Sequence, residues 1–592
     1  MIPTESFPEV SDRAGKSTPG AHQCYRLDMP QAHSAALADI LDFEGMRAIG
    51  EPTKFVVRFT HEQHDLSRTD YLNKAAALLV QPRLRHPRSR PEPEHRVHGV
   101  VTGFALLKTG RDQSTYEVVL ESRLALLRNT PKCRFFLDRS IPEIIRQILR
   151  EHGFDQLQAD FELALTKHYR KSAFVMQWEE DDLAFITRLC RRTGIWFVCE
   201  AGKHCERVRF CDDLTHYRRD AALDVPYLEH GNLDSGGAES VQTLAMYATT
   251  VPKTHSVRTY NPEQATSDTA NGEKTRHGDE TTYGEAHHWG TPGLMQQEAE
   301  EEANLRHEAA MAAQVEYRGT GDVLDLSPAA VLKLSNRELP DAPHGLLAVR
   351  VICRASRTAA YTVEFTAMPA ERLYRLPLRE QSWPRIDGVI TGTIAAPDRY
   401  VGPYLDEQGR YTVHLHPDRD ERVPGLESCP MRLAKPFAGA GQTGFHFGLV
   451  EGTVVTVGFL WGNPDLPYIS QVLHTAEATD PIVAGYPWGT RNTLRTRTNN
   501  TLQMDDRDGC EHIKVATEHG NPPTLSPNLL RFFDHHIHDS RAGFRDFDAS
   551  SYLRPRRIMD LPWDIKPASQ PDAASAAVSR AASSRQAAFS PT

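Results

Sequence analysis

The sequence predicts a mostly β protein with a few helices, and three patterns carry that prediction. Residues 54–60 alternate between apolar and polar side chains, as a half-buried strand does. Residues 98–104 and 116–120 are strand-like runs on either side of a turn signal at 109–112, which predicts a hairpin. From 388 to 473, short strand-like runs are separated by Gly, Pro and Asp without helical periodicity, which is typical of a small barrel or sandwich.

Three helices are expected among these strands. The first has Ser140 as its cap, Pro142 in its first turn, an apolar stripe, and Gly153 as its stop signal. The second fits residues 181–193, and the third is an Ala- and Glu-rich segment at 294–313. The combination predicts an α+β unit followed by an all-β unit.

The region from 492 to 515 alternates in two short runs joined by the turn Asp508–Gly509. Alternating Thr, Asn and Leu supply too little apolar surface for a compact domain, so this ribbon is expected to need pairing partners. Residues 521–564 have no clear period, and 567–592 are rich in Ala and Ser. Such composition predicts a disordered tail.

Length and composition set the outer limits. The chain has 592 residues, with 68 Lys and Arg against 78 Asp and Glu, a net charge of −10. At roughly 150 residues per domain, this length suggests about four units. A hydrophobic fraction of 40% and a charged fraction of 25% are those of an ordinary soluble protein. Collagen-like and wholly disordered chains are thereby excluded.

The compartment can be argued from the cysteines and the first residues. Nine cysteines form an odd, scattered set, which favours folding in a reducing compartment over a disulfide framework. Residues 1–20 lack the apolar core of a secretory signal, and no apolar stretch reaches the ~18 residues of a membrane span. We therefore expect neither a conventional export signal nor a membrane anchor.

Two segments partly match catalytic motifs, but each lacks a required residue. Residues 14–18 resemble the end of a phosphate-binding loop, but Val10 stands where its first glycine should be. His307 and Glu308 begin a zinc-protease signature, but Met311 replaces the second histidine. A Gly-x-Ser-x-Gly elbow is also missing from the sequence. We assign no catalytic residue and no cofactor.

Three further groups have plain structural interpretations. Structural zinc ligands usually stand two to four residues apart, so ordinary core or surface cysteines are favoured over a metal site in the cysteine group. For the histidine group, a solvated segment is favoured over metal binding. For the arginine-rich residues 83–96, a solvated loop is favoured over a phosphate site. No metal site is predicted. The cysteine and histidine groups are Cys199, Cys205 and Cys211, and His535, His536 and His538.

Six segments together resemble VgrG, the trimeric tip or spike protein of bacterial type VI secretion. That family is related to the hub and needle baseplate proteins of contractile phage tails. Each segment is modest alone, but all six occur in the family's order. They are 98–149, 179–200, 287–309, 406–421, 451–469 and 500–520.

The resemblance implies a mostly β fold with an α+β hub. The hub would have two β-barrel-like subdomains with inserted helices, followed by an OB-fold barrel and the start of a trimeric β-prism or β-helix stalk. Because the stalk repeat stops near Gly520, we expect a truncated stalk and a tail that is not an effector. The implied domains are a loosely ordered segment at 1–50, the hub at 51–377, the OB-fold needle domain at 385–475, the stalk start at 490–520 and a divergent, disordered tail at 521–592.

Eight residues are candidate structural motif positions within this resemblance. Gly409 would relieve a positive φ in a turn where Asp406 bonds its own backbone. Residues 462–465 supply turn chemistry between two strands. The full set is Asp406, Gly409, Arg410, Gly452, Gly462, Asn463, Pro464 and Asp465.

The implied function is a structural, non-enzymatic puncturing device exported by a contractile apparatus. It would form a homotrimer and bind the inner-tube protein, baseplate components, and an effector or a PAAR-type tip cap. It would assemble in the cytoplasm and leave through type VI secretion, outside the cell or into a target cell. Alternatives are a prophage tail hub and a spike with a C-terminal enzyme domain. A nucleic-acid module is disfavoured because basic and acidic residues are interspersed in 388–473.

Overall fold

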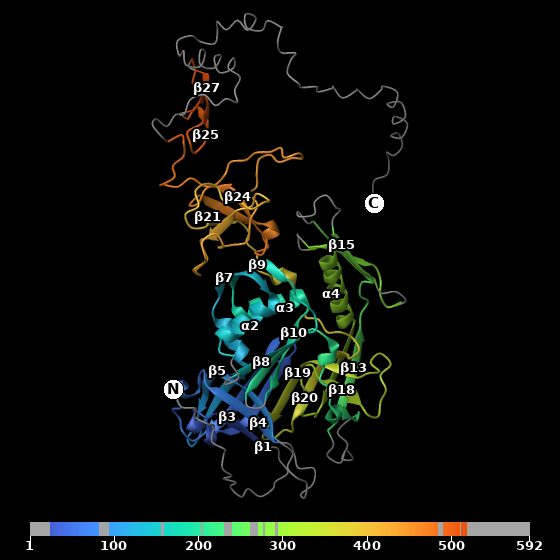
Figure 1. Cartoon of the computed structure of the whole chain (residues 1–592). Coiled ribbons are helices and arrows are strands. Elements are labelled where there is room, and N and C mark those ends of the chain that lie inside the picture. The colour runs from blue at the N-terminus through green and yellow to red at the C-terminus, as the bar shows by residue number, and fades with distance from the viewer. Residues whose placement is uncertain are drawn as a thin grey trace, which may run out of the picture. The chain divides into compact units, whose positions relative to one another are not determined.

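The computed structural model describes residues 24–81, 94–154, 159–202, 205–229, 239–260, 270–275, 279–290, 294–483, 489–509 and 511–517. The fold is mostly β (Figure 1). The chain divides into two compact units between His474 and Thr475. Among the described residues, no helix is both long and apolar enough to span a bilayer.

A twelve-stranded sheet is the largest element of the first unit. Its strands are β1 (Cys24–Asp28), β2 (Asp39–Ala48), β3 (Glu51–His61), β4 (Ala75–Gln81), β5 (His95–Thr109), β6 (Ser114–Glu121), β12 (Asp224–Val225), β13 (Val241–Ala248), β17 (Val315–Gly321), β18 (Val331–Leu334), β19 (Leu346–Ser356) and β20 (Thr362–Pro369). The main path runs β1-β4-β5-β6-β3-β2-β19-β20-β17-β13, with β18 joining β19, and β12 joining β18. The predicted hairpin is confirmed as the antiparallel pair β5–β6.

The expectation of a loosely ordered segment at 1–50 is wrong for residues 24–50. They form β1 and β2, and β2 pairs with both β3 and β19 inside the large sheet. Phe43 is buried, whereas Asp42 and Glu44 lie on the exposed face and pair with arginines of neighbouring strands. The acidic residues obscured a true strand alternation. Residues 1–23 lie outside the described part.

Aromatic residues dominate the core of the large sheet. Phe59 lies 5.7 Å from Tyr116 and 6.2 Å from Tyr71, measured between ring centroids. Tyr71 closes the short helix α1 (Arg68–Tyr71), whose Ser67 side chain accepts a hydrogen bond from the Thr69 backbone. The sheet therefore packs around rings supplied by both strands and loops.

A second core lies between two helices and the small sheets beside them. The elements are β7 (Lys132–Ser140), α2 (Ile141–Glu151), β8 (Ala159–Ala164), β9 (Lys171–Glu180), α3 (Asp182–Thr193), β10 (Trp196–Ala201) and β11 (Glu206–Cys211). The first two predicted helices are confirmed as α2 and α3. Ser140 and Glu143 form a capping box on α2, and Gly194 ends α3 in the left-handed conformation, with φ of 77°.

A separate layer consists of one sheet and the longest helix. Its sheet contains β14 (Thr254–Thr259), β15 (Ala270–Thr275) and β16 (Glu285–Trp289), in the order β15-β14-β16. The third predicted helix is confirmed as α4 (Gln296–Gln314), which packs along β14 and β15 (Figure 1).

The last sheet of the first unit is a four-stranded antiparallel one. It contains β21 (Val389–Ala395), β22 (Thr412–Leu415), β23 (Val454–Phe459) and β24 (Pro467–Val472), in the order β22-β21-β23-β24. Its apolar face shares a core with the β7–β9 hairpin: Phe135, Phe174 and Met176 pack with Val455, Val457 and Ile469. This small sheet thus buries its apolar surface partly against the preceding region.

The second unit contains three short antiparallel strands in its described part. They are β25 (Arg491–Arg495), β26 (Thr501–Asp505) and β27 (His512–Ala516). The prediction of two runs was wrong here, because the first run turns back on itself. Asn499 takes a positive φ of 61°, and Thr496 exchanges backbone hydrogen bonds with Asn500 and Asn499. The predicted tail from 521 lies outside the described residues.

Candidate functional site

The residues that the sequence singled out lie in three separate turns around the four-stranded sheet. Asp406, Gly409 and Arg410 share the first turn, Gly452 lies just before β23, and Gly462 to Asp465 connect β23 with β24. All eight residues therefore lie in turns, and the structure does not bring them together in one cavity. We call residues 460–466 the Asp465 loop.

Asp406 holds its turn closed. Its carboxylate accepts hydrogen bonds from the backbone of Gln408 at 3.0 Å and Arg410 at 2.8 Å, and from Arg410 Nε at 2.6 Å. Gly409 has φ of 73°. Partial burial opposes ionisation of Asp406, but the Arg410 backbone and side-chain hydrogen bonds outweigh it and lower its pKa.

Gly452 has a different part in the small sheet. Its φ is 82°, and its backbone N–H donates to the carbonyl of Ile394 at 3.0 Å. A side-chain carbon at this position would meet nothing within 4 Å. The backbone conformation, rather than crowding, is therefore what favours glycine there.

The Asp465 loop is built from consecutive left-handed residues and a side-chain turn. Trp461 and Gly462 have φ of 55° and 70°, and the Gly462 carbonyl accepts a hydrogen bond from Ile386 at 2.9 Å. Asn463 Oδ1 accepts from the Asp465 backbone at 3.1 Å. Pro464 is buried. This geometry aims the Asp465 carboxylate away from its own sheet.

Asp465 binds the region before the small sheet. Its carboxylate accepts a hydrogen bond from the Met176 backbone on β9 at 2.7 Å and from Arg192 Nη1 on α3 at 2.5 Å. Arg188 Nη1 lies 4.0 Å away. The Asp465 side chain is only 4% exposed and that of Arg192 is 30% exposed, so the carboxylate side of this ion pair is shielded from water. Sequence reasoning gave Asp465 turn chemistry alone and missed this role.

Arg188 is itself held in a buried network. Its guanidinium pairs with Glu180 Oε1 at 2.5 Å and donates to the Met176 carbonyl at 2.9 Å. Burial raises the pKa of Glu180, against the opposing effect of Arg188. The network stabilises the β9–α3 connection, to which the Asp465 carboxylate is hydrogen-bonded.

A second tie runs from the small sheet to the same hairpin. Arg422 Nη2 donates to the carbonyl of Phe135 on β7 at 2.9 Å, while its Nε bonds Asp418 at 2.7 Å. Together with the shared core, the two ties bind the four-stranded sheet to the β7–β9 hairpin. We call this contact the junction; it is made of hydrogen bonds, an ion pair and shared apolar packing.

The second unit presents an unpaired apolar face. Strand register places Leu494, Leu502 and Val515 in one row across the three strands. Met504 and Ile513 form the adjacent row on the same face. These five side chains have exposed fractions between 37% and 48%, so the described part of the chain does not cover this face. We call it the stalk face.

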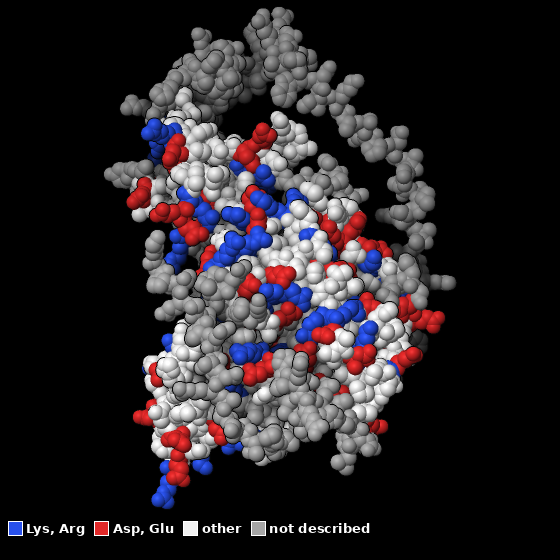
Figure 2. Space-filling view, turned by 60° about the horizontal axis from the view of Figure 1, so that its bottom comes forward, with Lys and Arg blue, Asp and Glu red and all other residues white. Residues whose placement is uncertain are grey.

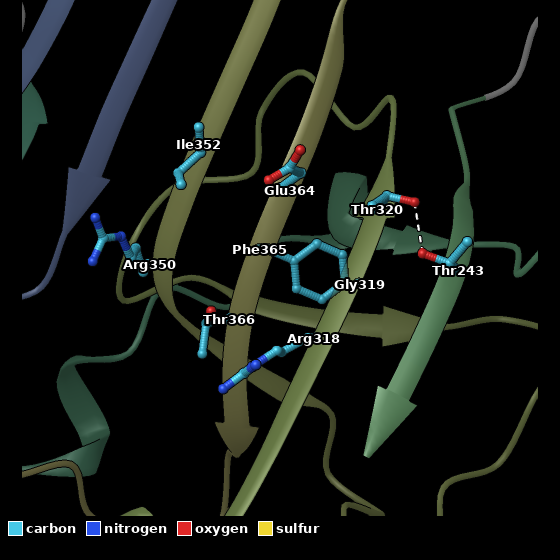
Figure 3. Close-up of a pocket in the computed structure, with 9 residues that line it drawn as sticks. All are labelled: Thr243, Arg318, Gly319, Thr320, Arg350, Ile352, Glu364, Phe365 and Thr366. Atoms are coloured by element: carbon cyan, nitrogen blue, oxygen red, sulfur yellow. Dashed lines mark hydrogen bonds between the residues drawn. The ribbon is translucent and has the colours of Figure 1, made fainter. Parts of the chain in front are cut away.

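A shallow hollow of about 240 Å³ lies on the exposed face of the large sheet, where β13, β17, β19 and β20 meet (Figure 3). Its polar groups already have partners: Thr243 Oγ1 lies 2.6 Å from Thr320 Oγ1, and Glu364 pairs with Arg354 at 2.5 Å. The same face carries two short ladders of alternating charge, which are Glu117–Arg58–Asp42 and Glu44–Arg354–Glu364. These residues form a solvated surface without a nucleophile beside a base.

The weaker chemical candidates are placed as follows. Cys199 and Cys211 are buried in β10 and β11, and Cys199 Sγ lies 3.4 Å from Ser122 Oγ. Within the described part, no group of His, Cys, Asp and Glu is arranged to hold a metal ion. The histidines at 535–538, the phosphate-loop-like residues 14–18 and most of the arginine loop lie outside it. On the face that Figure 2 shows, basic and acidic side chains are interspersed.

Comparison with known proteins gives a consistent result. The family model described as phage tail baseplate hub (GPD) matches residues 46–359. The type VI secretion system spike proteins VgrG1b and VgrG5 of Pseudomonas aeruginosa are each 26% identical to this chain, over 519 and 544 residues. These alignments cover 83% and 85% of this chain, but 67% and 65% of the relatives. The chain thus spans about two thirds of the length of these relatives.

A solved structure is similar over its whole length. It is the E. coli c3393 protein, described as a component of the type VI secretion system with structural similarity to the T4 bacteriophage tail proteins gp27 and gp5. The two are 26% identical, with a TM-score of 0.54. The match covers 76% of this chain and 100% of the other.

Proposed function

The chain belongs to the phage tail baseplate hub (GPD) family, and from its similarity to type VI spike proteins we propose that it is a structural spike protein of type VI secretion. In this role it sits at the tip of a contractile apparatus, is exported with it, and punctures a target. The spike-protein relatives and the similar type VI component support this proposal. No catalytic step is assigned to the chain.

The stalk face is the observation that carries the proposal. The three-stranded sheet leaves five half-exposed apolar side chains on one face, and burying that face against other chains would remove apolar surface from water. Three copies can bury these faces against one another and pair their sheet edges, which forms the start of a trimeric β-prism. Homotrimerisation thus supplies the core that one chain lacks.

The domain assignment belongs to the same proposal. Residues 51–377 form the hub, with two β-barrel-like subdomains; 385–475 form an OB-fold needle domain; 490–520 begin the stalk; and 521–592 are a divergent tail. The four antiparallel strands of the small sheet and the bridge from Leu433 to Ile469 support a small barrel. The junction then couples the hub with the needle, so that force along the spike passes through Asp465 and Arg422.

The partners follow from the place of a spike. The hub end binds the inner-tube protein and baseplate components, and the stalk end carries an effector or a PAAR-type cap. The protein assembles in the cytoplasm and is then secreted or delivered into a target cell. A C-terminal enzyme domain is the alternative for the tail, and activity of the isolated full chain on candidate targets would reveal it.

A prophage tail hub is the second candidate, because the matching family model is that of a phage tail baseplate hub. Secretion separates the two functions. We expect the chain to appear in culture medium only when the type VI sheath can contract, and L502D/I513D to abolish that release. Release that persists in a sheath-deficient strain, or accompanies phage particles alone, would contradict the spike assignment.

A further inference from the structure

The layer made of α4 and the β15-β14-β16 sheet has an unusual interior. Its apolar contents are small: Val257, Ala299 and Ala303 are buried, and they belong to none of the three large cores. The helix lies very close to the sheet, since a side-chain carbon on Gly272 would come within 2.0 Å of the Ala299 carbonyl oxygen. A change in the charge of a polar group buried in this thin interior should therefore strongly affect the packing of α4 on the sheet.

His255 is such a group. It points from β14 toward α4, is only 5% exposed, and neither ring nitrogen has a hydrogen-bond partner among the described groups. Its ring stacks on that of His288 from β16, with centroids 6.2 Å apart, and meets His307 from α4 edge-on at 5.7 Å. Buried polar groups without partners are rare and call for a physical explanation.

The charges around His255 are basic on every packed element. Arg306 and His307 face it from α4, and His288 from β16. On β15 its register partner is Lys274, whose side chain is exposed. Two carboxylates on this side, Glu302 of α4 and Glu380, already pair with Arg306 at 2.7 and 2.6 Å. Among the residues that the structure describes, a proton on His255 would find no unpaired carboxylate to balance it.

We infer that the contact between α4 and β14 is an acid-sensitive latch. At neutral pH the His255 ring is uncharged and packs under α4. In acid the ring takes a proton, its charge lies buried beside Arg306 and two further histidines, and α4 separates from the sheet. The inference concerns the layer alone and does not depend on the proposed spike function.

The direction of the pH effect follows from linkage. Burial, followed by His307, His288 and Arg306, lowers the pKa of His255 from 6.5 to about 4. The opened state therefore binds the proton more readily than the closed state. Closure is fully favoured above pH 6.5 and weakens as pH falls from 6.5 to 4. At pH 5 the opening equilibrium should rise about thirtyfold over its neutral value.

Release of α4 would reach beyond the layer. Glu308 on α4 pairs with the buried Arg375 at 2.8 Å, and the Met311 carbonyl accepts from Arg372 at 2.7 Å. Both arginines lie in the segment that leads from β20 toward β21. The latch thus sets how firmly that segment is held.

Hydrogen exchange of the full chain at pH 7.5 and pH 5, corrected for intrinsic rates, tests the latch. We expect amide protection in 296–314 to fall about thirtyfold at pH 5 in the wild type, and to stay level in H255L, which cannot titrate. H168Q, at an exposed histidine, should behave as the wild type does. Unchanged protection in the wild type, or the same loss in H255L, would overturn the inference.

A second measurement keeps the test sharp if H255L does not fold. Exchange of the histidine ring C2 hydrogen, followed by mass spectrometry on the wild-type chain, reports the pKa of each histidine. A value for His255 well below 6.5 supports the latch, and one at or above 6.5 rejects it. Zinc chloride provides a further arm: protection of α4 by zinc at pH 7.5 that H255L abolishes would make the cluster a metal site and overturn the latch.

Discussion

Asp465 is a turn residue whose carboxylate has been turned outward to bind a distant helix. Removing it leaves the Met176 N–H and the Arg192 guanidinium without this buried acceptor. Breaking one partner of a buried ion pair typically costs about 3 kcal/mol or more. We expect D465A to lower the local stability of 454–472 by that amount, measured by native-state hydrogen exchange, whereas D398A at an exposed aspartate should be neutral.

A double-mutant cycle distinguishes this ion pair from a general loss of packing. If Asp465 acts through Arg192, D465A and R192A together should cost clearly less than the two single costs added. Full additivity would show that the two side chains stabilise the junction independently.

Gly409 provides a purely conformational test. Its φ is 73°, and nothing lies within 4 Å of where a side-chain carbon would be. G409A should therefore cost about 1 kcal/mol through backbone strain alone, and G409N less. G409A and G388A can be compared by urea unfolding. G388A should be near neutral, because Gly388 has no positive φ and nothing lies within 4 Å of where its side-chain carbon would be. Equal losses at both sites would contradict the strain argument.

Gly409 and Asp465 show what the sequence could and could not predict for single residues. The turn around Gly409 is local, so glycine and aspartate signal it within five residues. The partners of Asp465 lie 273 and 289 residues away, and nothing in their own patterns marks them. Long-range polar contacts have no periodicity, which is why the junction was not predicted.

Among the secondary-structure elements, β7, β9 and the C-terminal end of α2 meet at one buried carboxylate on α3. Asp182 accepts hydrogen bonds from His152 at 2.7 Å, Lys132 at 2.5 Å and Gln177 at 2.9 Å. Burial opposes its ionisation, but these donors outweigh it and lower the pKa of Asp182 to about 2. Because its pKa is lower in the folded state, the ionised Asp182 stabilises the fold at pH values above the ordinary carboxyl pKa. This stabilisation is lost as pH falls toward 2.

Acid unfolding of the full chain between pH 4 and pH 2 measures this effect. We expect wild-type protection of α2 and α3 to fall across that window, and D182N to start lower and vary less. D112N, at an exposed aspartate, should retain the wild-type profile. A D182N profile identical to the wild type would show that the carboxylate does not link these elements.

The helices were predicted well because their signals are local. Ser140, Pro142 and Gly153 mark the ends of α2, and its apolar stripe is continuous. β2 was missed because Asp42 and Glu44 on its exposed face made it read as irregular. The 492–515 ribbon was misjudged for a similar reason: a polar turn around Asn499 lies within an otherwise regular alternation.

On the scale of the whole molecule, the stalk face should decide assembly. Leu502 lies on the central strand β26 of this face and Ile513 on the edge strand β27, and aspartate at both positions places charge where three chains would meet. We expect L502D/I513D to be monomeric. Q503E/K514E, on the opposite face of the same strands, should assemble as the wild type does, which a sedimentation experiment on both variants would establish.

The mass of the purified full chain by light scattering is the most direct test of a spike. One chain is 66.4 kDa, so a homotrimer predicts about 200 kDa. We expect this mass at micromolar concentration, without dissociation on dilution within the measured range. A stable monomer of 66.4 kDa would contradict the central claim that the stalk face is buried between three copies.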